Sequence, residues 1–91
     1  MTIEESFLNP IGGGVVIFSF NIKNSGKSEA TNVYWMVDTG SSDKNSERTK
    51  PINLSVGNFT RAYMQLYYSK SGTYNSKIIV EDDFKVLKNK L

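Results

Sequence analysis

The segment Val15-Val-Ile-Phe-Ser-Phe-Asn-Ile-Lys23 decides the fold class of this chain. Apolar side chains recur in it at every second position, and polar ones stand between them: Val16, Phe18, Phe20 and Ile22 against Ser19, Asn21 and Lys23. Successive side chains of a β-strand point to opposite faces of a sheet, so this alternation predicts a strand with one buried face. A helical spacing of apolar residues is not sustained in any part of the chain.

The same alternation recurs on both sides of this segment, bounded by clusters of Gly, Asn, Ser and Asp. We predict further strands at residues 2–8, 31–38, 60–68 and 74–80, an edge strand after Pro51 with Ile52, Leu54 and Val56, and a last strand opened by Phe84 and Val86. The connections are mostly too short for the helical crossovers of a parallel sheet. About seven such strands in 91 residues predict one domain, residues 1–91, folded as an immunoglobulin-like antiparallel β-sandwich.

Within these strands, two aromatic residues have predicted structural positions. Trp35 shares a face with Val33 and Val37, which places it in the core. Tyr74 opens a late strand and is expected to form a tyrosine corner, in which the hydroxyl bonds to the backbone a few residues upstream. Neither residue is therefore expected to contact a ligand.

The composition lowers the expectation of catalysis and of a cofactor. The chain contains no cysteine and no histidine, which removes thiol chemistry, disulfides, the usual general base near neutral pH and the commonest zinc ligand. We expect no enzymatic activity, no cofactor and no metal. The net charge of +2 is spread along the chain, so no nucleic-acid partner is predicted. No long apolar run and no leader-like start is seen, so no direct membrane insertion is predicted.

One segment resembles the active-site loop of an enzyme. Val37-Asp38-Thr39-Gly40-Ser41-Ser42 is similar to the loop of the aspartic proteases, in which two carboxylates share a proton. A chain of this length could supply the pair only as a homodimer. The apolar-apolar-Gly strand that buttresses such a loop is missing downstream, so a strand running into a turn is the preferred interpretation of Asp38.

The candidate binding surface lies on the predicted strand at residues 60–68. Its outward-facing side chains are Arg61, Tyr63, Gln65 and Tyr67. Aromatic and arginine side chains are the residue types that carry most energy in protein contacts, and exposed aromatic rings also stack on sugars. Tyr34 faces outward too, but its strand belongs to the other sheet in the immunoglobulin-like order. Ordinary cross-strand packing on a solvated sheet is the alternative interpretation of the four residues.

Three weaker motifs favour structural explanations. Gly12-Gly13-Gly14 lacks the lysine and helix of a phosphate cradle and is expected to be a flexible turn. The acids at residues 81–83 could hold calcium, but neighbouring side chains on an extended segment point apart, which favours a solvated turn. Asn53 and Asn58 match the glycosylation acceptor pattern, which occurs by chance in a chain so rich in Asn, Ser and Thr.

The order of several motifs resembles that of the cell-adhesion-related (CARDB) domains of bacteria and archaea. A strand ends in Asn24-Ser-Gly26, and a link of small residues leads to Asn32-Val33 and the next strand. The second half is similar as well, with Ile52-Asn-Leu-Ser-Val-Gly57, then Ser71-Gly-Thr-Tyr74, and a strand ending in Ile79-Val-Glu-Asp82. The family often closes on an acidic, Asn-rich tail, whereas this chain ends on Lys85-Val-Leu-Lys-Asn-Lys-Leu91.

The resemblance implies a non-catalytic extracellular module of a prokaryotic cell-surface protein, which acts in interaction, adhesion or spacing. Its partner would be a protein or a cell-surface polymer. The alternatives are a homodimeric aspartic protease that uses Asp38, a carbohydrate-binding module, and an assembly component of an archaeal surface filament.

Overall fold

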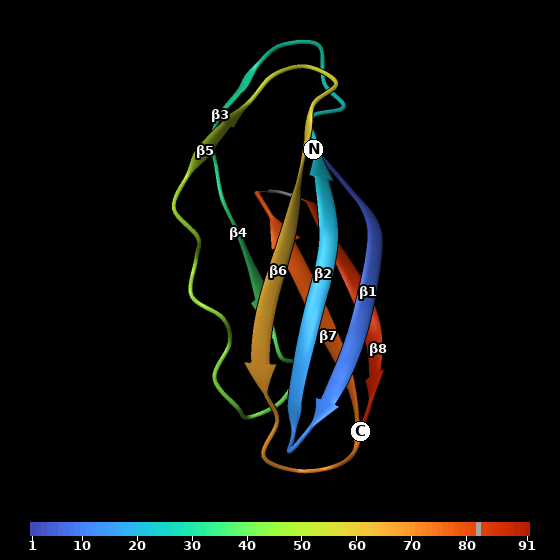
Figure 1. Ribbon diagram of the computed structural model, residues 1–91. Helices are drawn as coiled ribbons and strands as arrows, with labels where there is room; N and C mark the ends of the chain where they lie inside the picture. The colour runs from blue at the N-terminus through green and yellow to red at the C-terminus, as the bar shows by residue number, and fades with distance from the viewer. Residues whose placement is uncertain (82) are drawn as a thin grey trace.

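The computed structural model describes residues 1–81 and 83–91, which form eight antiparallel strands and contain no helix (Figure 1). The first sheet has the order β1-β2-β6, with bounds Thr2–Gly12, Val15–Lys23 and Phe59–Tyr67. The second has the order β4-β7-β8, with bounds Trp35–Asp38, Thr73–Val80 and Asp83–Lys90. A short pair, β3 (Ala30–Val33) and β5 (Ile52–Leu54), lies beside them. The predicted all-β sandwich is confirmed.

The core lies between the two sheets, and β2 contributes four of its side chains. Its four predicted inward side chains are fully buried: Val16, Phe18, Phe20 and Ile22. From the facing sheet come Val37, Ile78 and Val80, also fully buried, and Trp35 is 9% exposed. Each such side chain stabilises the fold by about 1.5–3 kcal/mol relative to exposure. The predicted core position of Trp35 is confirmed.

The first strand is longer than predicted and changes face along its length. It extends past the expected end at Leu8 as far as Gly12, where Gly13 and Gly14 turn the chain into β2. Between Glu4 and Phe7 the pairing with β2 shifts by one residue, and Glu5 has a φ of 48°. Such a β-bulge moves every following side chain to the opposite face.

The predicted strand at residues 31–38 is two strands, which explains the count of eight instead of seven. The backbone leaves regular geometry at Asn32, where φ is 56°, and pairing changes from β5 to β7 around Tyr34. The faces nevertheless follow the predicted alternation, because Val33, Trp35 and Val37 are all buried. One continuous alternation therefore crosses from the short pair into the second sheet.

The polar loop at residues 39–50 runs along the open edge of β4. The backbone amides of Ser46 and Thr49 donate to the carbonyls of Val37 and Trp35, at 2.9 and 3.1 Å. In return, the amides of Val37 and Trp35 donate to the side-chain oxygens of Ser46 and Thr49, at 2.7 and 3.1 Å. The Thr39 amide donates to Asn45 Oδ1 at 2.9 Å. The loop thus takes the place of a neighbouring strand, with hydroxyl and amide side chains supplying acceptors.

A buried polar cluster ties this loop to the end of the sandwich. The hydroxyls of Tyr68 and Ser76 are 2.6 Å apart, and their oxygens lie 3.0 and 2.8 Å from the carbonyl oxygen of Thr39, so the two hydroxyl hydrogens serve all three contacts. Gly40 has a φ of +74°, and a Cβ there would lie 2.2 Å from the carbonyl oxygen of Asn75. The close approach of these two backbones therefore requires glycine at position 40.

Asp43 holds the same loop to the β6–β7 connection. Its Oδ2 accepts hydrogen bonds from the Ser69 amide at 3.0 Å and from the Ser41 hydroxyl at 3.1 Å. The Ser69 amide is the main cause that lowers the pKa of the Asp43 carboxyl below its ordinary value of 3.8. On the other side of the connection, the Tyr74 hydroxyl donates to the Lys70 carbonyl at 2.7 Å. This is the bond expected of a tyrosine corner.

Two apolar segments lie outside the core. Strand β5 ends at Leu54, and Val56, expected on that strand, is 51% exposed in the following turn. Phe84 and Val86 open β8 as predicted but are 57% and 48% exposed, because Leu87 and Asn89 take the inward positions. None of the described segments forms a helix with the length and hydropathy needed to cross a membrane.

The molecule is elongated along its strands, with principal extents of 42 × 21 × 19 Å. Strand β1 starts near one end of the sandwich, and the chain leaves β8 near the other (Figure 1).

Candidate functional site

The predicted surface lies on the outer side of the β1-β2-β6 sheet. Tyr63 is 70% exposed and Tyr67 is 57% exposed, and Gln65 between them is also exposed. The inward side chains of the same strand, Ala62 and Leu66, are buried and fix its orientation. The alternation in β6 therefore places all four predicted residues on one outer face, with Arg61 half-buried at one end.

Arg61 is held in place by neutral groups. Its Nη1 donates to the Glu5 carbonyl oxygen at 3.0 Å and to Asn21 Oδ1 at 3.1 Å, and its Nη2 donates to Ser19 Oγ at 3.0 Å. Asn21 and Ser19 stand on β2 beside Arg61 and Tyr63 in the register. Because these acceptors carry no charge, they orient the guanidinium without neutralising it.

Phe7 belongs to the same surface, although the sequence pattern did not predict that its side chain faces outward. It pairs with Ser19 on β2, which in turn pairs with Tyr63, and its ring is 59% exposed. The Arg61 guanidinium carbon lies 5.7 Å from the centre of the Phe7 ring and 5.9 Å from that of Tyr63. Arginine above aromatic rings at such distances is a cation–π arrangement.

A signal for Phe7 was present in the sequence. Strict alternation from the buried Ile3 would put Glu5 and Phe7 inward together, and a carboxylate in that position would be costly. The bulge at Glu5 resolves this conflict and turns Phe7 outward. We call the five residues Phe7, Arg61, Tyr63, Gln65 and Tyr67 the aromatic face. It offers exposed rings for stacking, tyrosine hydroxyls for hydrogen bonds, and one oriented cation.

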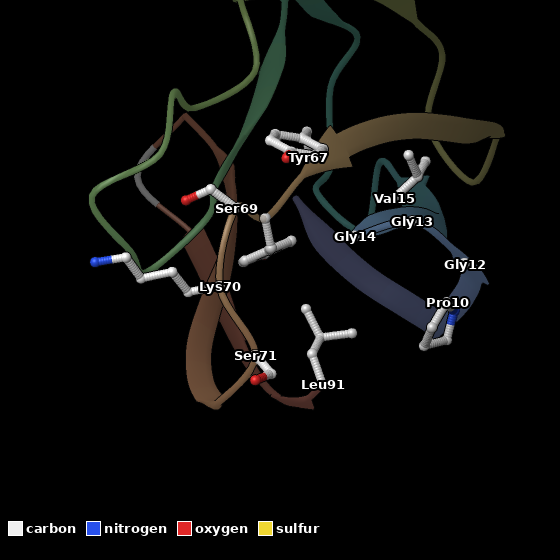
Figure 2. Close-up of a pocket in the computed structure, with 11 residues that line it drawn as sticks. Pro10, Gly12, Gly13, Gly14, Val15, Tyr67, Ser69, Lys70, Ser71 and Leu91 are labelled. Carbon is white, nitrogen blue, oxygen red and sulfur yellow. The ribbon is translucent and has the colours of Figure 1, made fainter.

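A pocket of about 340 Å³ opens beside one end of this face. Figure 2 shows it between the glycine turn and the segment from Ser69 to Ser71, with Leu91 on one side and Tyr67 at its upper edge. The turn comes this close because Gly14 lacks a side chain: a Cβ there would lie 2.3 Å from the Tyr68 carbonyl oxygen. Gly13 and Gly14 both have positive φ and form the two-residue hairpin turn between β1 and β2, where a turn was predicted.

Asp38 lies in the other sheet, at the end of β4, and is not part of the aromatic face. Its Oδ1 accepts a hydrogen bond from the Gly40 amide at 2.8 Å, which is the geometry of an Asx turn. The protease alternative requires a second copy of this loop, and it stays a prediction.

The acidic turn at residues 81–83 is only partly described, because Asp82 lies outside the described residues. Glu81 has a φ of 54°, and Asp83 Oδ1 accepts a hydrogen bond from the Phe84 amide at 2.9 Å. Among the described residues, no group of three or more acidic side chains is arranged to hold a metal ion. The preference for a solvated turn over a calcium site at these residues stays a prediction.

Comparison of the chain with protein-family models, with curated proteins and with solved structures found no match. By its fold, the chain is an all-β, antiparallel domain of 91 residues.

Proposed function

We propose that this chain is a non-catalytic interaction module that binds its partner through the aromatic face. The observation that carries the proposal is the exposure of three large rings, Phe7, Tyr63 and Tyr67, each by more than half, on one sheet face, where an oriented arginine lies beside the first two. Leaving such rings in water forgoes the free energy of their burial, which a bound partner would recover.

The kind of partner follows from the resemblance to the cell-adhesion-related domains. As a member of that family, the chain would be an extracellular module of a prokaryotic surface protein, and it would bind a protein or a cell-surface polymer. Tyrosine and arginine are the residue types most enriched among energetically important contacts, which supports a protein partner.

A carbohydrate is the second candidate, and the spacing of the tyrosines supports it. Tyr63 and Tyr67 are four residues apart on one strand, which separates their Cα atoms by about 13 Å. Both rings are exposed on a sheet, so they could stack on two sugar rings of one extended chain.

The test compares two double variants that remove aromatic or apolar groups from opposite outer faces. Tyr63→Ala/Tyr67→Ala removes two rings of the aromatic face, whereas Phe84→Ala/Val86→Ala removes comparably exposed groups from β8. Isotope-labelled protein is titrated with a panel of soluble cell-wall glycans and purified surface proteins, and amide chemical shifts are followed. We expect the first variant to lose affinity by about tenfold or more, and the second to bind like the unmodified chain.

Two results would contradict the proposal. One is equal binding by both variants to every ligand that the unmodified chain binds. The other is cleavage of a peptide library at acidic pH that disappears in Asp38→Asn, because this would make the chain an aspartic protease. Shifts that appear only with glycans would favour the second candidate.

A further inference from the structure

A second surface hollow lies away from the aromatic face, where the β3–β4 junction meets the end of the polar loop. It has a volume of about 450 Å³ and is lined by Asn32, Tyr34, Arg48, Thr49, Lys50 and Pro51. Two of these residues are cations, one is aromatic, and none is acidic. It shares no residue with the aromatic face. We call it the basic groove.

Arg48 in the basic groove has a defined orientation and no acidic partner within ion-pair distance among residues 1–81 and 83–91. Its guanidinium carbon lies 4.5 Å from the centre of the Tyr34 ring, which holds the group by a cation–π contact. The neighbouring acid, Glu47, has its carboxylate 3.8 Å from the ammonium of Lys44. Over residues 1–81 and 83–91, that pair is the one ion pair, and Arg48 takes part in none.

Thr49 sets the directions of its two neighbours. Its amide and its hydroxyl both bond to the backbone of Trp35, so this residue faces β4. Arg48 and Lys50, on either side, are exposed and both line the groove. Side chains two residues apart on an extended segment stand about 6–7 Å from each other. Arg48 and Lys50 therefore stand at alternate positions of one segment, as two carboxylates of an extended peptide do when one residue separates them.

We propose that the basic groove binds an acidic peptide segment in extended conformation, with carboxylates at alternate positions. One carboxylate pairs with the Arg48 guanidinium and the other with the Lys50 ammonium, while the residue between them contacts Tyr34 and Pro51. Arginine and lysine bound to carboxylates form charge-assisted hydrogen bonds. A nucleic acid fits the groove less well, because its dense phosphate charge calls for more cations than these two.

The experiment uses two synthetic peptides with the same composition and charge. Acetyl-Gly-Glu-Gly-Glu-Gly-amide carries its carboxylates at alternate positions, and acetyl-Gly-Glu-Glu-Gly-Gly-amide carries them side by side. Amide chemical shifts of the isotope-labelled chain are followed during titration at low salt. We expect the first peptide to bind more tightly and to shift the amides of Tyr34 and Lys50, and added salt to weaken it.

The variants Arg48→Gln and Lys50→Gln each remove one cation and are each expected to weaken the first peptide by about fivefold. Lys85→Gln removes the same charge from β8, outside the groove, and should change the affinity little. All three positions are exposed, so the fold is retained.

Three outcomes would overturn the proposal: equal binding of both peptides, unchanged affinity in Arg48→Gln, or tighter binding of a short polyphosphate than of the first peptide. Because these variants leave Tyr63 and Tyr67 in place, failure here is separate from failure of the proposed function.

Discussion

Two segments of this chain are ordered by opposite means. Strand β2 alternates apolar and polar residues, and its inward side chains are fully buried in the core. The loop at residues 39–50 is polar throughout, and it is held by hydrogen bonds to β4, Tyr68 and Ser69. Removal of apolar surface from water stabilises the first, whereas the second depends on directional bonds that satisfy a strand edge.

The loop closes an edge of the sandwich, because β4 has no neighbouring strand on that side. An open edge exposes amides and carbonyls that can pair with other chains. Here the side chains of Ser46 and Thr49 accept hydrogen bonds from two amides of β4, and Asn45 accepts one from the residue that follows the strand. The loop therefore covers the edge without adding a strand that would require its own buried face.

The largest effect is expected from breaking β2. Phe18→Ala removes a fully buried ring and should lower the free energy of unfolding by about 3–5 kcal/mol. That is a large share of the stability of a domain of this size. Urea unfolding followed by Trp35 fluorescence measures the loss. Ile17→Ala, on the outer face of the same strand, is the control and should cost much less. Equal losses at the two positions would contradict the role given to β2.

An intermediate effect is expected from the loop. Ser46→Ala removes the hydroxyl that accepts the Val37 amide at 2.7 Å, and should cost about 1 kcal/mol. Hydrogen exchange of the Val37 amide should become faster, because its acceptor is lost. Ser42→Ala, an exposed position in the same loop, should leave this exchange unchanged. If the Val37 amide kept its protection in Ser46→Ala, the conclusion that loop side chains accept the hydrogen bonds of the β4 amides would be wrong.

The smallest effect is expected from the carboxylate that ties the loop down. Because hydrogen bonds lower the folded pKa of Asp43, its ionised form stabilises the fold above the unfolded pKa. This contribution is lost as the pH falls through the folded pKa. Asp43→Asn should therefore be less stable than the unmodified chain at neutral pH, and the difference should shrink as the pH falls below 3.8 and through the folded pKa.

Urea midpoints of both proteins at several pH values measure this difference, with Glu47→Gln as the control from the same loop. A difference between Asp43→Asn and the unmodified chain that stayed constant with pH would show that the carboxylate has no such role.

The sequence was sufficient where apolar alternation was uninterrupted. The bounds and faces of β2 are confirmed, as are the outward positions of Arg61, Tyr63, Gln65 and Tyr67 on β6. In these strands a shift of one residue would expose the whole apolar set, so the pattern specifies the register strongly. The fold class followed from such segments.

The rest depended on backbone irregularities and on partners distant in sequence. Periodicity shows the conflict at Glu5 but does not show how the backbone resolves it, so Phe7 was missed as a member of the aromatic face. Nor did it reveal the change of pairing at Tyr34, because the alternation continues across it. The basic groove brings Tyr34 together with Arg48, fourteen positions on, through bonds that Thr49 makes to Trp35. No local pattern announces such a contact.

The positions of the first and last strands have a mechanical consequence. The chain enters near one end of the sandwich in β1 and leaves near the other after β8 (Figure 1). A tensile force applied between these ends would act along the strands and slide β1 past β2 and β8 past β7. In that shear geometry many interstrand hydrogen bonds share the load and must yield together. Copies of the domain joined end to end would each add up to 42 Å to the length of the assembly.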